Sequence, residues 1–216
     1  MTYSKNDKLE KVYAAKTDAQ RRQAYNDWAA SYDIDVSSFG IQLPYVGASV
    51  FARHVSLGMG PILDAGCGTG MHSLPLKLMG YHNFHGIDLS EGMIEIARQR
   101  QIYDSLQTMA LGGPLGFEDD QFSVTYSIGC LAPGNAPPNS LDEFIRVTQP
   151  GGLIIWSTHG HINSQTQPYH DYRAKLSEEK LWSLKFETPA FVSMPNGDSD
   201  IKHAIYVYRV SSRRVL

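Results

Sequence analysis

The sequence predicts one α/β domain in which helices cover both faces of a mostly parallel sheet of seven strands. From residue 61 onward, short β-type runs alternate with helical runs, which is the pattern of consecutive β-α-β units. The 216 residues suffice to bury a full sheet between helical layers and are too few for two ordinary domains. We therefore expect a doubly wound sheet in a single domain, residues 1–216.

Two helical runs precede the sheet, in residues 18–33 and 42–57, because their apolar side chains recur at helical spacing. We expect both to be helices of an N-terminal cap formed by residues 1–57. The core of the domain then comprises residues 58–216.

The elements of the core follow in order. Ser90 and Asn139 are suited to cap the helices that follow them, because their side-chain oxygens can accept from free N–H groups of the first turn. The predicted strands are 62–65, 84–88, 106–110, 122–128 and 152–158, and the predicted helices between them are 70–79, 91–100 and 140–148.

The last part of the chain predicts a hairpin. A helix over 169–184 precedes two β-rich runs, 186–194 and 201–210, and Pro195-Asn196-Gly197-Asp198 between them is a strong turn signal. Because a hairpin reverses the chain direction, we expect an antiparallel strand at the C-terminal end of the sheet.

Charge and composition narrow the classes of function. The net charge is −3, and phosphate neutralisation needs clustered Lys and Arg side chains, so we expect no nucleic-acid partner. No segment has the pattern of a membrane span or a signal peptide. The two cysteines lack the spacing of a disulfide framework and suit a reducing compartment. We expect a cytoplasmic monomer or homodimer with no membrane partner.

A glycine-rich loop after the first strand indicates the chemistry. The strand contains an acid, Asp64, and three glycines follow at alternate positions before a helix begins. Glycines let the backbone bend sharply and approach a small molecule that a Cβ atom would exclude. In a dinucleotide fingerprint the third glycine follows the second by three positions, and Met71 occupies that position here. Asp88 ends the next strand, where a carboxylate can accept from both hydroxyls of a ribose.

The segment Asp64-Ala65-Gly66-Cys67-Gly68-Thr69-Gly70, together with Asp88, resembles motif I and the following acid of the class I S-adenosylmethionine-dependent methyltransferases, whose sheet is Rossmann-like. Residues 115–122 resemble the family's loop before strand four, and 143–152 resemble its motif before strand five. Within the family, the chain looks closest to the methyltransferase-like proteins named after the Williams–Beuren syndrome chromosomal region.

The resemblance implies S-adenosylmethionine as the cofactor. Asp64 would orient the loop and the methionine amino group, and Asp88 would bind the ribose. The family commonly has an Asp where this chain has Leu111-Gly112, so a backbone group would recognise the adenine there. The implied cofactor site also includes Ala65, Gly66, Cys67, Gly68 and Gly70 of the loop, Leu89 and Met93 against the adenine, and Ser127.

Three aromatic residues, Tyr25, Trp28 and Tyr32, lie at helical spacing in the first predicted helix. Their ring faces are suited to stabilise a sulfonium cation. The same stripe is equally suited to dock the helix on the sheet. The pattern leaves both interpretations open.

The candidates for a general base are His159, at the carboxyl end of the strand over 152–158, and His161 two positions later. Open α/β sheets bind ligands at this edge, so either imidazole is placed to take a proton from an acceptor. The alternative is that both are solvent-facing loop side chains. With His170 they make a possible metal set, but no Cys or carboxylate pattern accompanies it, so we expect no metal.

The sequence thus favours a methyltransferase that moves the methyl group of S-adenosylmethionine to a small-molecule O, N or S nucleophile by in-line displacement. One alternative is a catalytically silent protein that binds the cofactor and acts in regulation. A nicotinamide-dependent oxidoreductase is a weaker alternative, because Met71 breaks the glycine spacing that a pyrophosphate needs.

Overall fold

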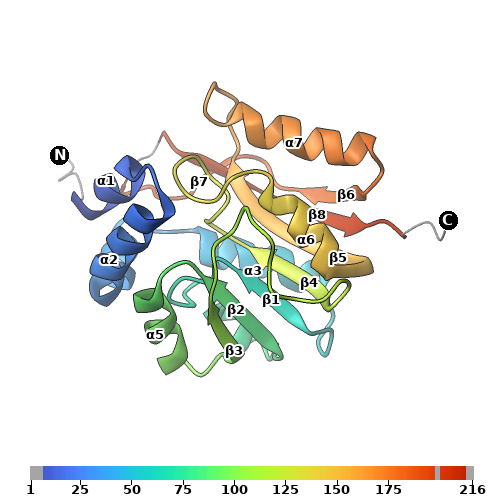
Figure 1. The fold of residues 1–216 in the computed structure, drawn as a ribbon, viewed down its shortest axis with the longest axis horizontal. Coiled ribbons are helices and arrows are strands. Elements are labelled where there is room, and N and C mark those ends of the chain that lie inside the picture. Colours follow the sequence, from blue (N-terminus) through green and yellow to red (C-terminus); the bar gives the residue numbers. More distant parts are fainter. Residues whose placement is uncertain (1–6, 198–199, 213–216) are drawn as a thin grey trace.

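The computed structural model describes residues 7–197 and 200–212 (Figure 1), so Asp198 of the predicted turn lies outside the described residues. The helices are α1 (Asp7–Ala14), α2 (Asp18–Ser38), α3 (Leu43–His54), α4 (Leu74–Leu78), α5 (Glu91–Gln99), α6 (Ser140–Val147) and α7 (Gln167–Glu178). The strands are β1 (Ile62–Ala65), β2 (Phe84–Asp88), β3 (Tyr103–Thr108), β4 (Phe122–Ser127), β5 (Thr148–His159), β6 (Trp182–Glu187), β7 (Phe191–Val192) and β8 (Lys202–Val210).

The strands form one sheet in the order β3-β2-β1-β4-β5-β8-β6, and the short β7 pairs with β8. Strands β1 to β5 are parallel to one another. Strand β8 is antiparallel to both β5 and β6, which confirms the predicted mostly parallel sheet with an antiparallel C-terminal strand. The chain order reverses between β1 and β4, and sheets of this kind bind ligands beyond the carboxyl ends of the strands at such a point.

Helices cover the two faces of the sheet because successive side chains of a strand point to opposite faces. On one face, α3 and α4 pack on a cluster that includes Ile62 and Ile155. On the other face, α6 and α7 cover a cluster that includes Leu63 and Ile154. The predicted cap helix over 42–57 therefore corresponds to α3, which packs on the sheet itself. Helices α1 and α2 pack on each other, and α2 also packs on α5 (Figure 1).

The structure corrects the predicted number and bounds of the C-terminal strands. Within the described residues the sheet has eight strands, because the strand predicted over 186–194 is divided into β6 and β7. Strand β6 begins at Trp182, inside the helix predicted over 169–184. That helix ends at Glu178, since Lys180 has a positive φ of 57° that a continuous helix does not accommodate.

Other local predictions had mixed outcomes. Ser90 caps α5 as predicted, with its hydroxyl accepting from the Met93 N–H at 3.1 Å. The prediction for Asn139 was wrong: its side chain donates instead to the Gly112 carbonyl at 2.9 Å. Strand β3 starts at Tyr103, three residues before its predicted start, and α1 was not predicted.

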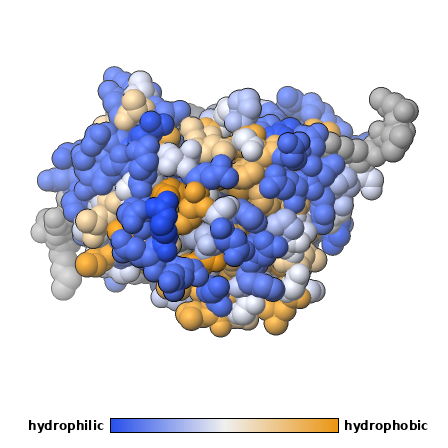
Figure 2. All heavy atoms as spheres, turned by 60° about the horizontal axis from the view of Figure 1, so that its bottom comes forward, coloured by the Kyte–Doolittle hydropathy of each residue, from blue (hydrophilic) through white to orange (hydrophobic). Residues whose placement is uncertain are grey.

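The described part of the chain contains no helix that is long and apolar enough to cross a membrane. Figure 2 shows a face that is largely hydrophilic, with hydrophobic side chains in separate patches. The large hydrophobic side chains that are exposed include Ile34, Leu57 and Leu78.

Candidate functional site

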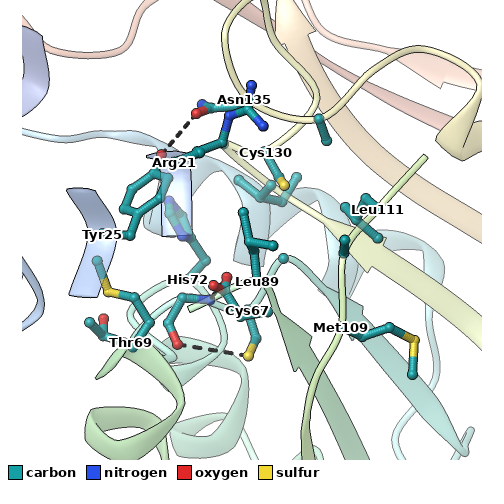
Figure 3. Close-up of a pocket in the computed structure, with 18 of the residues that line it drawn as sticks. Arg21, Tyr25, Cys67, Thr69, His72, Leu89, Met109, Leu111, Cys130 and Asn135 are labelled. Atoms are coloured by element: carbon teal, nitrogen blue, oxygen red, sulfur yellow. Dashed lines mark hydrogen bonds between the residues drawn. The ribbon is translucent and has the colours of Figure 1, made fainter. Parts of the chain in front are cut away.

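A cleft of about 770 Å³, called the main cleft below, opens at the carboxyl ends of the central strands and is covered on one side by α2 (Figure 3). Its walls come from the loops after β1, β2, β3 and β4 and from α2. Of the predicted cofactor-site residues, those that line it are Tyr25, Tyr32, Gly66, Cys67, Gly68, Asp88, Leu89, Met93 and Leu111.

Two glycines of the loop after β1 line this cleft and have positive φ, 80° for Gly66 and 54° for Gly68. A Cβ atom at Gly66 would lie 2.3 Å from the sulfur of Cys130, so the packing of the protein itself requires glycine there. A Cβ atom at Gly68 would meet nothing within 4 Å. The space beside Gly68 is therefore available to a ligand that approaches the backbone closely.

Asp88 ends β2 and presents its carboxylate to the main cleft. One carboxylate oxygen accepts from the Gly68 N–H and the other from the Ser90 N–H, both at 2.9 Å. Burial raises the pKa of Asp88, and the backbone hydrogen bonds oppose this shift. Since each carboxylate oxygen has two lone-pair sites, both oxygens can accept a further hydrogen bond from a ligand.

Asp64 does not line the main cleft, whereas the resemblance implied that it orients the loop and the methionine amino group, directly or through water. Its side chain is only 2% exposed and accepts from the Ser73 and Tyr103 hydroxyls, both at 2.6 Å. Burial raises the pKa of Asp64 to about 6, although these two hydrogen bonds lower it. Asp64 thus holds the segment after the glycine loop in place from beneath.

Four more predicted residues lie outside the lining of the main cleft. The Ser127 hydroxyl donates to the Ala65 carbonyl at 2.7 Å and joins β4 to β1. Gly70 has a φ of 81° and packs against the Tyr103 ring. Gly112 lines a separate, open groove. These residues shape the walls of the cleft and do not face into it.

Helix α2 is held over the cleft by side-chain hydrogen bonds, which include those of Asn26 and Asp33. The Asn26 side-chain oxygen accepts from the Ser90 hydroxyl at 2.6 Å and from the Gly92 N–H at 3.0 Å. Asp33 accepts from the Thr69 hydroxyl at 2.6 Å. Sequence reasoning missed all of these contacts, because they join residues that are far apart in the chain.

Four apolar side chains line the main cleft from the segments that follow β2 and β3: Leu89, Met93, Met109 and Leu111. Together they form a surface suited to a flat heterocycle. Sequence reasoning missed Met109, although its position directly after β3, at the carboxyl edge of the sheet, was a usable signal.

A second hollow of about 650 Å³, called the inner chamber below, adjoins the main cleft. Tyr25, Tyr32, His72, Gly129 and Asn135 line both. Its other walls come from α1, the segment between α2 and α3, and the ends of β5 and β8.

The predicted aromatic stripe of α2 lies at this boundary. The Tyr25 and Trp28 rings are nearly parallel with centroids 6.4 Å apart, and the Tyr32 ring meets Trp28 edge-on at 4.8 Å. The Tyr25 hydroxyl donates to the Asn135 side chain at 2.9 Å across the cleft (Figure 3). Trp28 is only 1% exposed and lines the inner chamber but not the main cleft. Its indole N–H donates to Asp35 at 2.8 Å.

The two predicted catalytic histidines are placed differently. His159 lines the inner chamber, whereas His161 lines neither hollow and stacks on His159 with ring centroids 5.5 Å apart. The His203 ring of β8 meets His159 edge-on at 4.9 Å. Burial lowers the pKa of His203 to about 3, and the positive charges that neighbouring histidines acquire on protonation lower it further.

His72 is a site residue that sequence reasoning missed. It follows the glycine loop by two positions and lines both hollows. Burial lowers the pKa of His72 to about 4, although the negative charge of Asp33 raises it. Its proximity to the glycine loop was the signal that could have identified it. In the described ranges, no group of three or more His, Cys, Asp or Glu side chains is arranged to hold a metal ion.

Residues 63–156 match the family described as a methyltransferase domain, and this match spans the glycine loop, Asp88 and the strands that position them. This match and the relatives below support a class I S-adenosylmethionine-dependent methyltransferase. Human methyltransferase-like protein 27 is 33% identical to this chain over 159 residues, which are 71% of this chain and 62% of that protein. The demethylmenaquinone methyltransferase of Clavibacter sepedonicus is 41% identical over 97 residues, which are 44% of this chain and 39% of that protein. The chain thus spans less than two thirds of either relative.

Solved structures share the fold of this methyltransferase at low sequence identity. A Haloferax volcanii putative methyltransferase in complex with the Trm112 methyltransferase activator has a TM-score of 0.67, with 16% identity over 90% of this chain and 99% of that chain. The [4+2]-cyclase SpnF has a TM-score of 0.68, with 15% identity over 91% of this chain and 98% of that chain. At these identities the likeness concerns the fold alone.

The residues of the main cleft fit S-adenosylmethionine, the cofactor of this family. Gly68 leaves room for close approach to the backbone, and Asp88 has lone pairs free for two hydroxyl groups. The apolar side chains after β2 and β3 suit a purine. The fit is therefore one of shape and of hydrogen-bonding capacity.

Proposed function

We propose that this protein transfers the methyl group of S-adenosylmethionine to a small-molecule O, N or S nucleophile by in-line displacement. The observation that supports this most is the inner chamber, which shares five lining residues with the main cleft and is covered by α1 and α2. In-line displacement needs a nucleophile aligned with the departing sulfur in a water-poor pocket, and a chamber beside the cofactor with mostly apolar and aromatic walls supports this.

The proposed roles follow from where the side chains lie. Asp88 binds the ribose hydroxyls, and the backbone of residues 66–68 lines the rest of the cofactor. The cofactor supplies an electrophilic methyl group on a sulfonium. Tyr25 and Tyr32 face both hollows, and their rings stabilise the cation while they cover the reaction from water. His159 and His161 remain predictions as proton acceptors.

The cofactor assignment is tested by calorimetric titration of S-adenosylmethionine into the wild type, Asp88→Asn and Asp104→Asn. Asp104 is a matched control, because it is an exposed acid of β3 outside the main cleft. We expect Asp88→Asn to weaken binding by about tenfold or more, since hydrogen bonds to a charged acceptor are lost. Equal affinity of all three proteins, or no binding by the wild type, would contradict the assignment.

Turnover separates the enzyme from a silent binding protein. The enzyme releases S-adenosylhomocysteine when small nucleophiles are added, whereas a regulatory protein binds the cofactor without release. The fold does not decide this, since a [4+2]-cyclase shares it. We further propose that the protein is a cytoplasmic monomer or homodimer. We also propose that it has no nucleic-acid partner, and the net charge of −3 supports this last point.

A further inference from the structure

We infer that the methyl acceptor is an uncharged aromatic molecule with a hydroxyl group, and that His72 accepts the proton of that hydroxyl during methyl transfer. This rests on the proposed function, because it concerns the acceptor of the same site. It adds the chemical class of the acceptor and a catalytic residue.

The inner chamber has an uncharged lining. Among the described residues that line it, none is Asp, Glu, Lys or Arg. Asp35 of α2 lies nearby, but it is held by the Trp28 indole and the Ser31 hydroxyl, both at 2.8 Å, and by the Lys8 ammonium at 3.2 Å. An ammonium or carboxylate group that enters such surroundings loses its hydration without gaining an oppositely charged partner from the lining, so the chamber favours a neutral molecule.

The walls of the inner chamber are largely aromatic. Tyr25 and Tyr32 line it with their rings, which pack on the buried Trp28, and Phe39 adds apolar surface from the end of α2. Aromatic walls gain most from a flat aromatic ligand, which stacks on ring faces and meets ring edges.

One imidazole faces both the cofactor and the acceptor. His72 lines both the main cleft and the inner chamber, and its ring lies about 3.3 Å from where a Cβ atom on Gly129 would be. His203 lines the chamber and not the cleft, and its Nδ1 shares a hydrogen bond with the Ser193 hydroxyl at 2.7 Å. His159 lines the chamber and not the cleft. A group at the boundary is the one that can meet a nucleophile aligned with the cofactor.

The proton balance agrees with a hydroxyl acceptor. A lone pair of the acceptor oxygen forms the new bond to the methyl carbon as the carbon–sulfur bond breaks, and that bonding pair stays on the sulfur of S-adenosylhomocysteine. The hydroxyl proton passes to the neutral His72 ring and then to water. A methylated oxygen that still carries its proton is a strong acid. It therefore gives up the proton even to His72, although burial lowers the pKa of His72 to about 4 and the charge of Asp33 opposes this shift only in part. A methylated ammonium would keep its proton and would not need such a base.

Charge selectivity is tested by calorimetry on the full chain with S-adenosylhomocysteine bound, using three probes that share a naphthalene ring: 2-naphthol, 2-naphthoate and 2-(aminomethyl)naphthalene. We expect 2-naphthol to bind about tenfold or more tightly than either charged probe, because charge burial is costly. If a charged probe binds as tightly as 2-naphthol, the inference is overturned.

The role of His72 is tested by methylation of 2-naphthol by His72→Gln and His72→Phe, the second of which keeps a planar ring. The control is His82→Gln, an exposed histidine before β2. We expect both His72 variants to lose about a hundredfold in kcat, with the affinity for S-adenosylmethionine unchanged, and the control to match the wild type. Retained kcat in either His72 variant that binds the cofactor overturns the assignment. A wild type that binds the cofactor and methylates amines but not 2-naphthol overturns this inference alone, whereas failure to bind the cofactor refutes the proposed function itself.

Discussion

Gly66 and Gly68 are two positions apart in one loop, yet they are required to be glycine for different reasons. At Gly66 the limit is the Cys130 side chain, which a Cβ atom would approach to 2.3 Å. At Gly68 the protein imposes only its φ of 54°, because the adjacent space is open. The first glycine is therefore required by the packing of the fold, whereas the second is required only by its backbone conformation and leaves the space beside it open to a ligand.

This difference predicts separate effects of alanine substitution. Gly68→Ala should destabilise the fold by about 1 kcal/mol, the cost of a side chain at positive φ, and should weaken S-adenosylmethionine binding by about tenfold or more. Gly66→Ala should cost more, about 2–4 kcal/mol, because overpacking adds to the backbone strain. Urea unfolding and calorimetric titration measure the two effects.

Gly151→Ala is the matched control for this experiment. Gly151 has a φ of 81°, a Cβ atom there would meet nothing within 4 Å, and the residue lies outside the main cleft. The Gly151→Ala variant should lose about as much free energy of unfolding as Gly68→Ala, and it should bind the cofactor with the affinity of the wild type. Unchanged affinity in Gly68→Ala would show that no ligand approaches this part of the loop.

At the scale of elements, α2 is a wall of the site that lies outside the sheet. It packs on α1 and α5, and side chains such as Asn26 and Asp33 bind the segments that line the main cleft. The central strands, by contrast, are paired on both sides within the sheet. We therefore expect α2 to open more readily than the sheet.

Asn26→Ala should increase the opening of α2, because the Ser90 hydroxyl and the Gly92 N–H lose their partner at a cost of about 1–3 kcal/mol. Amide hydrogen exchange should show about tenfold faster exchange in α2, with β4 and β5 unchanged. The control is Gln23→Ala on the same helix, where the exposed side chain donates a hydrogen bond to Asp27 at 2.7 Å. Equal exchange in both variants would contradict the role given to Asn26.

At the scale of the whole molecule, the fold gathers histidines from distant segments. His72 comes from the segment after β1, His159 and His161 from the end of β5, and His203 from β8. Burial and their mutual repulsion in the protonated state keep the buried members neutral. The site is thus assembled with groups that the folded protein resists protonating.

The fold should therefore lose stability as the pH falls below about 6.5, the pKa of a histidine in the unfolded chain. With a folded-state pKa of about 3, His203 stays neutral in the folded protein while the unfolded chain takes up a proton. Stability then falls by roughly 1 kcal/mol per pH unit for this residue, and the loss ends near the folded-state pKa. Urea unfolding of the wild type and His203→Gln between about pH 7 and about pH 4.5 measures it.

We expect a shallower decline of stability in His203→Gln than in the wild type. His72 also lowers the stability of the fold as the pH falls, because its pKa is lowered to about 4. Asp64 has the opposite effect: its pKa is raised to about 6, so its protonation stabilises the folded state as the pH falls. The comparison of slopes removes both contributions, because they are common to the two proteins. Parallel slopes would contradict a neutral His203 in the folded state.

The sequence by itself determined the glycine loop, Asp88 and the order of strands and helices, because these depend on conformations and spacings within a few residues. It also placed Tyr25 and Tyr32 on the helix that covers the cleft. It did not determine that Asp64 turns away from the cleft, since the partners Ser73 and Tyr103 reach it only after the strands pair.

The tertiary structure alone decided the inner chamber. Its walls combine residues from Leu9 to His203, and the sequence contains no local signal that brings them together. The boundary between α7 and β6 was also decided by tertiary contacts, because Trp182, the first residue of β6, is buried in the core cluster on one face of the sheet. Local patterns specify backbone conformation, whereas burial, charge environment and enclosure arise from contacts between segments that are distant in the chain. For this reason the cofactor was predictable from the residues, and the chemistry of the acceptor chamber became accessible only from the fold.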